Sequence, residues 1–364
     1  MSLPPLKLGE LIARIPIIQG GMGIGVSGSS LASAVANTGG IGIISAVQIG
    51  FKEDDFEINP KQANIRALKS EIKRARELSP HGILGVNIMV AASDYEDLVK
   101  TAVEENIDLI ICGAGLPSTL PKLIKGSKTK IAPIVSSGRA ALVISKLWIR
   151  KFNYVPDLII VEGPNAGGHL GFSKEELTFD KHLDISSITK DVLKVTKNLE
   201  KEYGKHIPVV AAGGIFDGKD IANMIKLGAE GVQMATRFVA TEECDAHINF
   251  KKVYISASKD DIVLIKSPVG MPGRAINNKF AQFVKDSSIP VTRCYNCLKP
   301  CNPKETPYCI SKALINAVKG DIENGLFFSG SNAYKINKIC TVKELICELV
   351  EEANKLLDKK APSC

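Results

Sequence analysis

Eight apolar, β-rich runs alternate with helical patterns over the first 258 residues of the chain. Strands that are apolar along their whole length are typical of a parallel sheet covered by helices on both faces. The expected strands are residues 15–21, 41–46, 83–90, 109–115, 130–137, 158–163, 208–214 and 231–238. Eight strand–helix units in sequence, joined by right-handed crossovers, predict a closed α/β fold, the (β/α)8 TIM barrel. A doubly wound sheet is the alternative, but the units are regular and no switch point is evident, which favours closure.

The helical patterns between these strands indicate the domain organisation. They cover residues 30–37, 60–78, 95–105, 139–150, 187–203, 217–227 and 245–258. After residue 258 the alternation weakens, residues 259–310 are rich in loops, and two helices at 311–324 and 341–359 are expected to close the chain. A length of 364 residues suits one barrel with an appended segment. We therefore expect a barrel over 1–258 and a cysteine-containing, helical extension over 259–364 that packs on it.

Composition excludes several classes of function. The net charge is +7, but Lys and Arg are spread along the chain and form no basic stripe interleaved with aromatic residues, so we expect no nucleic-acid partner. Neither an N-terminal signal segment nor a stretch of ~18 apolar residues is found, so we expect a cytoplasmic protein without a membrane partner. The oligomeric state, a homodimer included, is left open.

Glycine and small polar residues end the last two expected strands. The turns comprise Ala212, Gly213 and Gly214 after the seventh strand and Gln233, Met234, Ala235 and Thr236 after the eighth. In a barrel, phosphate groups bind at these two turns, where glycine lets backbone N–H groups face the ligand. The helix expected from Asp217 would add its positive end. Either turn alone could be an ordinary tight turn, but together they predict a phosphate-bearing cofactor.

Further candidates for ligand contacts lie at the ends of other strands. The glycine-rich turn after the first strand can lie flat against a planar ring. An amide after the third strand can bond a ring edge, and a carboxylate after the sixth can accept hydrogen bonds from hydroxyl groups or amides. The alternatives are that the amide is only a hydrogen-bonded turn residue and that the carboxylate has only a structural role. The residues concerned are Gln19, Gly20, Gly21, Met22, Asn87 and Glu162.

His169 lies on the glycine-rich turn after the sixth strand, directly behind Gly167 and Gly168. A lone histidine is usually a surface or satisfied residue, but this turn faces the expected pocket. An imidazole titrates near neutral pH and can move a proton to or from a substrate carbon. We therefore predict that His169 is catalytic.

Four of the nine cysteines lie close together in the expected extension, at Cys294, Cys297, Cys301 and Cys309. Thiols at this spacing in a reducing cytosol are typical of metal ligation, and we expect a [4Fe–4S] cluster or zinc. Four free thiols or a redox pair are the alternatives. The loop is expected to lie beside the mouth of the pocket.

The segments IPIIQGGMG, GVNIM, EGPNAGGHLG, PVVAAGGI and GVQMATRFVATEE together resemble the nitronate monooxygenase (2-nitropropane dioxygenase) family. They resemble about equally the related FMN-dependent enoyl-ACP reductases. The resemblance covers roughly residues 10–260 and implies a barrel that binds FMN. By position, it implies a catalytic base at His169 and flavin contacts at Gln19 to Met22, Asn87, Glu162, Gly167, Gly214 and Gln233 to Thr236.

The sequence departs from this family pattern at three places. Ala235 stands where the family usually has glycine, which would shift the phosphate slightly. Glu162 stands where many nitronate enzymes have glutamine, whereas enoyl reductases carry the glutamate. The cysteine segment lies outside the pattern, and its spacing is similar to the cluster loop of FMN/iron–sulfur barrel enzymes such as dienoyl-CoA reductases.

Three hypotheses for function follow. The first is an FMN enzyme that oxidises a nitronate, with O2 as final acceptor and His169 taking the proton α to the nitro group. The second is an FMN-dependent reductase that takes electrons from NAD(P)H, or through a cysteine-bound cluster, and reduces an activated C=C bond. The third is a non-catalytic flavin-binding or metal-binding protein, against which the histidine argues.

Overall fold

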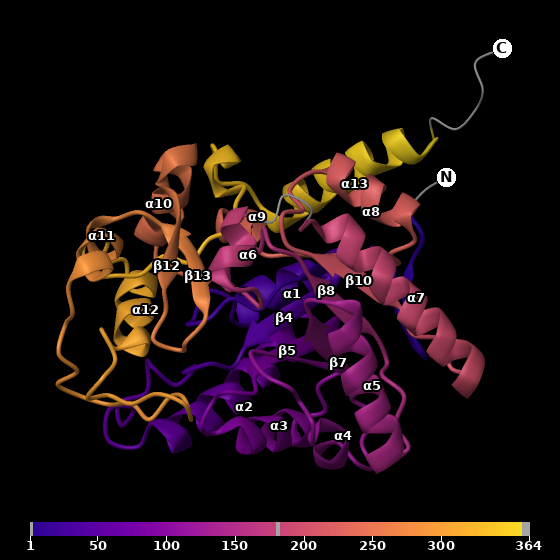
Figure 1. Ribbon diagram of the computed structural model, residues 1–364, viewed down its shortest axis with the longest axis horizontal. Helices are drawn as coiled ribbons and strands as arrows, with labels where there is room; N and C mark the ends of the chain where they lie inside the picture. Colours follow the sequence, from indigo (N-terminus) through magenta and orange to yellow (C-terminus); the bar gives the residue numbers. More distant parts are fainter. Residues whose placement is uncertain (1–2, 180–182, 359–364) are drawn as a thin grey trace.

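The computed structural model describes residues 3–179 and 183–358, and its centre is a closed barrel of eight parallel strands (Figure 1). The strands are β3 (Ile17–Gln19), β4 (Ile41–Ser45), β5 (Ile83–Met89), β6 (Leu109–Gly113), β7 (Lys130–Val135), β8 (Ile159–Glu162), β10 (Val209–Ala212) and β11 (Gly231–Met234). They pair in chain order, and β11 pairs with β3 to close the ring. All eight fall within the expected runs, so the (β/α)8 prediction is confirmed.

The barrel is closed at one end, which leaves the other for a ligand. Strand side chains such as Ile18, Ile111 and Val210 fill the interior. The hairpin of β1 (Leu6–Leu8) and β2 (Leu11–Ala13) adds Leu6 and Leu8 to the same buried cluster, beneath the strands. Because apolar side chains fill this end of the barrel, the space for a ligand lies at the carboxyl ends of the strands.

Helices surround the barrel in the expected order, with bounds within three residues of the prediction. They are α1 (Ser29–Thr38), α2 (Pro60–Leu78), α3 (Tyr95–Glu104), α5 (Gly138–Phe152), α7 (Ile185–Tyr203), α8 (Gly218–Leu227) and α10 (Ile248–Ser256), with the shorter α4 (Leu120–Leu123), α6 (Lys174–Phe179) and α9 (Thr236–Val239). Side-chain caps start several of them, as where Ser137 accepts from the N–H of Ala140. Left-handed glycines such as Gly39 and Gly228 end others.

The region 259–310 is more regular than the sequence predicts. It contains a short helical turn η1 (Lys259–Asp261), a hairpin of β12 (Ile262–Lys266) and β13 (Pro272–Ile276), and α11 (Lys279–Asp286). Strand β13 also pairs with the two-residue strand β9 (Gly168–His169). The prediction of loops here is wrong for these elements, because the hairpin is completed by a strand about a hundred residues earlier in the chain. Local sequence carries little signal for such a pairing.

The chain ends in two helices, as expected. Helix α12 (Ile310–Val318) is shorter than predicted, because the chain turns at Gly320, whose φ is +90°. A further turn η2 (Ala333–Lys335) precedes α13 (Val342–Asp358), which lies beside α8 (Figure 1). Residue 359 of the predicted helix lies outside the described residues, and the domain boundary at 258 stays a prediction. None of the helices in the described ranges is both long and apolar enough to cross a membrane.

Candidate active site

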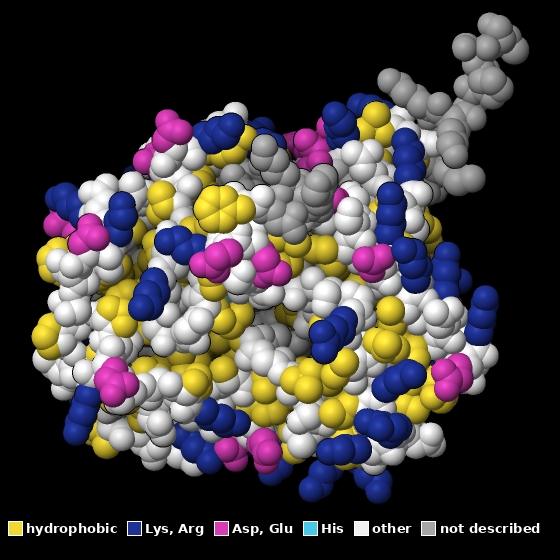
Figure 2. Space-filling model, viewed as in Figure 1, with side chains coloured by type: hydrophobic (Ala, Val, Ile, Leu, Met, Phe, Trp, Pro, Cys, Tyr) yellow, Lys and Arg dark blue, Asp and Glu magenta, His cyan; other side chains and the backbone are white. Residues whose placement is uncertain are grey.

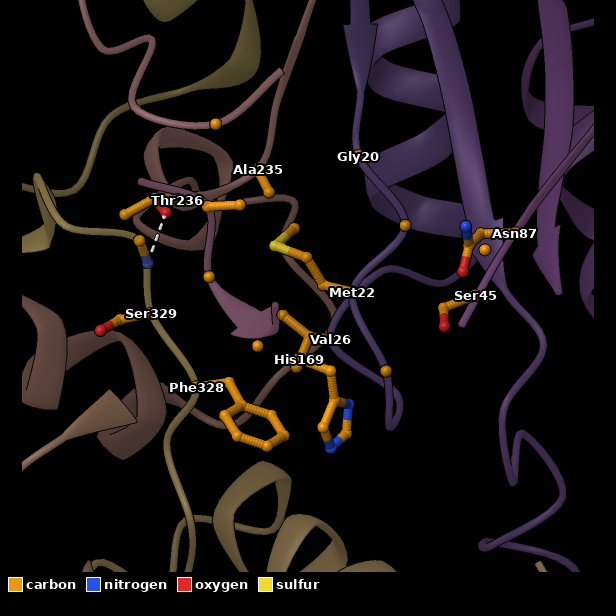
Figure 3. A pocket seen from close by; sticks show the side chains of 18 of the residues that line it. Gly20, Met22, Val26, Ser45, Asn87, His169, Ala235, Thr236, Phe328 and Ser329 are labelled. Carbon is orange, nitrogen blue, oxygen red and sulfur yellow. Dashed lines mark hydrogen bonds between the residues drawn. The ribbon is translucent and has the colours of Figure 1, made fainter. Parts of the chain in front are cut away.

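A cavity of about 270 Å3 lies at the carboxyl ends of the barrel strands. Figure 2 shows a hollow near the middle of the face viewed in Figure 1, bordered largely by hydrophobic side chains. Figure 3 shows the side chains around the cavity. The predicted contacts that line it are Gly20, Gly21, Met22, Asn87, Glu162, Gly167, Gly168, His169, Gly213, Gly214, Gln233, Met234, Ala235 and Thr236.

Gln19, by contrast, lies beneath the cavity, inside the barrel. Its side chain is completely buried, with Oε1 accepting from the N–H of Ile43 and Nε2 donating to the carbonyl of Gly20. These bonds hold the glycine turn against β4. A cofactor contact at Gln19 stays a prediction, and the bonds themselves support a positioning role.

The turns after β10 and β11 form a cradle suited to a phosphate. Gly213 and Gly214 have φ values of +92° and +87°, which favour glycine. Among the described residues, nothing accepts a hydrogen bond from either backbone N–H. Free N–H groups in such a concave turn are typical anion ligands. A Cβ on Gly214 would lie 2.8 Å from the Cβ of Asn165, so no larger residue fits without displacement.

A third segment, Phe328–Asn332, completes the cradle and was missed from the sequence. The Oγ1 of Thr236 accepts from the N–H of Gly330 at 3.1 Å (Figure 3), and the Nδ2 of Asn332 donates to the carbonyl of Gly214 at 2.8 Å. The Tyr254 hydroxyl donates to the carbonyl of Phe328. The glycine- and serine-rich run in this segment is the signal that could have found it.

Helix α8 does not direct a free N-terminus at the cradle, contrary to expectation. The N–H of Gly218 donates to a carboxylate oxygen of Glu352 on α13, and the N–H of Asp220 donates to the N-cap residue Asp217. Two carboxylates therefore already occupy the positive end of this helix. These caps do not support the predicted contribution of α8 to phosphate binding, which stays a prediction, whereas the glycine N–H groups are available for that role.

The opposite wall of the cavity comes from the turn after β3. It is formed by Gly20, Gly21 and Met22, and a Cβ on Gly21 would overlap the Asn87 side chain. Asn87 and Ser45 lie side by side at the ends of neighbouring strands, across from Thr236 (Figure 3). A planar ring fits such a wall, with the amide of Asn87 at its edge. Ser45 was missed from the sequence, although it ends an expected strand.

Glu162 ends β8 and carries its carboxyl group into the cavity wall. In the described part of the chain, the carboxylate has neither a hydrogen-bond partner nor an ion-pair partner. Desolvation raises the pKa of Glu162 to about 7. A carboxyl group of this pKa can hold or release a proton at neutral pH.

His169 lies on β9, where pairing with Gly273 of β13 fixes its backbone. Its Nε2 is 2.7 Å from the Oγ of Ser267. The ring meets the Phe328 ring edge-on, with 4.9 Å between centroids (Figure 3). Desolvation lowers the pKa of His169 to about 4, so the imidazole is neutral at physiological pH and able to accept a proton.

These two groups give opposite pH dependences of stability in the flavin-free protein. Because the pKa of Glu162 is raised from 4.5 to about 7 on folding, stability falls as pH rises through that window. Because the pKa of His169 is lowered from 6.5 to about 4, stability rises over pH 4 to 6.5.

Because Glu162→Gln removes the contribution of Glu162, we expect the stability of this variant to show the rise with pH that comes from His169. From pH 4.5 to 7, the stability of the wild type should fall relative to this variant by roughly 3 kcal/mol, at about 1.4 kcal/mol for each pKa unit. Urea unfolding of flavin-free protein at a series of pH values measures this difference. Parallel curves for the two proteins would contradict the raised pKa of Glu162.

Arg274 of β13 holds the loop that carries His169. Its Nη1 donates to the carbonyls of Pro164 at 2.7 Å and Ala166 at 2.5 Å. The side chain is buried, and these two carbonyls are its hydrogen-bond partners. The loop between β8 and β9 thus takes its shape from the extension, about a hundred residues away.

Arg274→Met should therefore lower stability by about 1–3 kcal/mol, because both carbonyls would lose their donor in a buried setting. It should also reduce activity, because the loop that leads to His169 would lose the side chain that holds its carbonyls. Arg293→Met is the matched control: Arg293 pairs with Glu57 at the surface, where such a pair contributes about 0–1 kcal/mol. Denaturant unfolding of both variants gives the comparison, and equal losses would contradict the proposed role of Arg274.

The extension also supplies an apolar side of the cavity. Lining residues come from the cysteine loop, from α12 and from the segments around them, and they are Val269, Cys297, Leu298, Ile310, Leu314, Leu326 and Phe328. The prediction that the cysteine loop lies beside the pocket is confirmed. The individual residues were not predicted, because the sequence of a loop-rich region does not show whether an apolar residue lines a core or a cavity.

The metal centre expected at Cys294, Cys297, Cys301 and Cys309 finds no support in the structure. Within residues 3–179 and 183–358, no group of three or more His, Cys, Asp or Glu side chains is placed to hold a metal ion. All four cysteines are free, and they range from exposed Cys294 to buried Cys297. Burial raises the pKa of the Cys297 thiol to about 11, so it stays protonated at neutral pH.

The chain is thus a TIM barrel with glycine turns and a half-buried imidazole in one cavity, and the comparisons show that it is a flavin-dependent oxidoreductase. The family model for nitronate monooxygenase matches residues 6–352. The chain belongs to this family, whose members depend on FMN.

Three similar proteins carry three different names. A probable nitronate monooxygenase of Staphylococcus saprophyticus is 25% identical, over 99% of this chain and all of the relative. A (3aS,4S,5R,7aS)-5-hydroxy-7a-methyl-1-oxo-octahydro-1H-indene-4-carboxyl-CoA dehydrogenase of Rhodococcus jostii is 27% identical, over 79% of this chain and 70% of the relative. The solved structure of FabK from Thermotoga maritima is 29% identical with a TM-score of 0.73, over 95% of this chain and 94% of that one.

Proposed function

We propose that this chain is an FMN-dependent nitronate monooxygenase, with His169 as the base when the substrate is the parent nitroalkane. The observation that carries the proposal is a neutral, half-buried imidazole in the same cavity as the glycine turns suited to a phosphate. The family membership supports both the cofactor and the reaction.

The residues present fit FMN. The N–H groups of Gly213 and Gly214, with the Thr236 hydroxyl, would hold its phosphate, and the wall of Gly20 to Met22 would hold its ring against Asn87. When bound, FMN would supply an acceptor for the electrons of the substrate and a route for them to O2.

His169 carries out the proton step. The C–H bond next to the nitro group breaks, and its proton passes to an unprotonated ring nitrogen of His169, which leaves a nitronate anion beside an imidazolium. Ser267 orients the ring through its contact with Nε2. The apolar side of the cavity keeps water away from this ion pair, which strengthens it.

A second candidate is an FMN-dependent reductase of enoyl thioesters that draws electrons from NAD(P)H. Glu162 favours it, because a carboxyl group with a pKa of about 7 can donate the proton that such a reduction needs. The described residues that line the cavity include neither Lys nor Arg, which suits an uncharged substrate. The 29% identity to FabK supports it as well.

Oxygen consumption separates the two candidates. Purified FMN-loaded enzyme should consume O2 with propyl-2-nitronate and release nitrite, without NADH. NADH oxidation that depends on crotonyl-CoA, with no O2 uptake on the nitronate, would overturn the first proposal in favour of the second.

We also propose that the enzyme acts on small molecules in the cytoplasm. The support is the set of free thiols among the described residues, which a reducing compartment preserves.

A further inference from the structure

A second cavity, of about 250 Å3, lies on the far side of Glu162 and His169. Its walls come from the ends of β6 and β7, the start of α5 and the turn of the β12–β13 hairpin. The residues that line it are Ala114, Gly115, Leu116, Pro117, Pro133, Ile134, Val135, Ser136, Ala140, Ile144, Glu162, His169, Gly171 and Met271. Nothing in the site described above uses the space between α5 and the hairpin turn.

The two cavities share a wall. Ala114, Ile134, Glu162 and His169 line both of them. A substrate carbon held at His169 therefore has a second space directly beside it. The first cavity is the one that contains the phosphate cradle and the turn after β3, so a cofactor bound there would leave the second for the rest of the substrate.

The chemistry of the second cavity suits an aliphatic group. Apart from Ser136 and backbone, its polar side chains are Glu162 and His169, and both lie in the shared wall. The remaining lining side chains, from Leu116 to Met271, are apolar, and Leu116 is 46% exposed at its rim. Such a space binds hydrocarbon and excludes charge.

We propose that the second cavity binds the alkyl chain of the substrate while its reacting carbon lies against His169. Since roughly 10–15 Å3 of such space holds one water-sized group, a cavity of about 250 Å3 has room for a chain of several methylenes. The enzyme therefore prefers substrates with an unbranched, uncharged chain over the shortest members of a series. The identity of the reacting group rests on the proposed function, whereas the preference for a chain rests on the cavity alone.

Binding of unbranched alcohols, from ethanol to octanol, tests the cavity without turnover. By calorimetry on the FMN-loaded enzyme, affinity should rise about fourfold for each added methylene, as expected for burial of hydrocarbon. Ala140→Phe fills the cavity and should abolish this rise. Val143→Phe is the matched control, because Val143 lies on the same helix but is exposed outside the cavity. An equal rise in the wild type and Ala140→Phe would overturn the proposal.

A second pair of variants guards against misfolding of Ala140→Phe. Leu116→Asp places a charge at the half-exposed rim and should lower octanol affinity about tenfold or more. Leu142→Asp, at an exposed position of α5 outside the cavity, should leave octanol affinity unchanged. Equal affinity in Leu116→Asp and the wild type would also overturn the proposal.

Activity on a series of nitronates, from nitroethane to nitrooctane, separates this proposal from the proposed function. Wild-type kcat/KM should rise with chain length, and Ala140→Phe should remove this rise. If alcohols bind as expected but no nitronate is oxidised, the proposed function fails and the cavity assignment stands. If nitronates are oxidised with the same length profile in both proteins, the cavity assignment fails and the proposed function stands.

Discussion

His169→Ala is expected to lower turnover of neutral nitroalkanes by about a hundredfold or more, the range that a positioned acid or base contributes. The imidazole is neutral at physiological pH, faces the cavity and lies against Ser267, so it can accept the proton of the substrate. FMN content should stay that of the wild type, because the cradle is formed by other residues. Steady-state O2 consumption, normalised to flavin absorbance, measures the effect.

The pH profile gives this prediction a second measurement. The pKa of His169 is lowered to about 4, so the imidazole stays neutral as pH falls from 8 to about 5. Over this range, the wild-type kcat/KM for a nitroalkane should not fall through protonation of the base. A preformed nitronate needs no deprotonation, so His169→Ala should affect it much less.

His206→Ala is the matched control for this variant. His206 lies at the surface between Glu200 and Glu230, away from the cavity, and its loss should not change turnover. Unchanged rates on a neutral nitroalkane in His169→Ala would remove His169 from the mechanism.

The barrel and most of its ligand contacts were predictable because their signals are local. A strand such as β10 is apolar on both faces over consecutive residues, and the glycines that follow it adopt the left-handed conformation that their sequence allows. The order of the units then fixes which turns meet at one end of the barrel. Gly214, Thr236 and His169 could therefore be assigned to one cavity without coordinates.

The parts that escaped prediction depend on contacts between distant segments. Arg274 reads as an ordinary surface cation, yet it is buried against the carbonyls of Pro164 and Ala166. The strand β12 is apolar but only half-buried; its partner β13 follows after one turn, and β13 in turn pairs with β9, about a hundred residues earlier in the chain. Such pairings are set by tertiary packing, which local propensity does not encode.

The cysteine loop shows the limit of spacing as evidence. Four thiols within sixteen residues satisfy the sequence pattern of a metal site, but ligation also requires that their sulfur atoms converge on one point. Cys297 and Leu298 of this loop contribute to the wall of the cavity. A pattern of residue types predicts a site only when the backbone directs the side chains together.

Gly214→Leu is expected to yield colourless protein, because the leucine side chain would occupy the phosphate cradle. The Cβ alone would lie 2.8 Å from the Cβ of Asn165, and the carbonyl of Gly214 is held by Asn332, so the turn has little freedom to move away. The φ of +87° adds a strain of about 1–3 kcal/mol for a residue with a side chain. Flavin absorbance of the purified variant, before and after incubation with excess FMN, measures the loss.

Gly126→Leu separates the effect of the blocked cradle from that of backbone strain. Gly126 has nearly the same φ, +85°, but a Cβ there would meet nothing within 4 Å. This variant should therefore carry a similar strain and a lower melting temperature, yet retain its full complement of flavin. If Gly214→Leu also retained full flavin, the phosphate would bind elsewhere. If both variants lost flavin equally, backbone strain rather than occupancy of the cradle would explain the loss. The assignment of Gly213 and Gly214 to phosphate binding would then be contradicted.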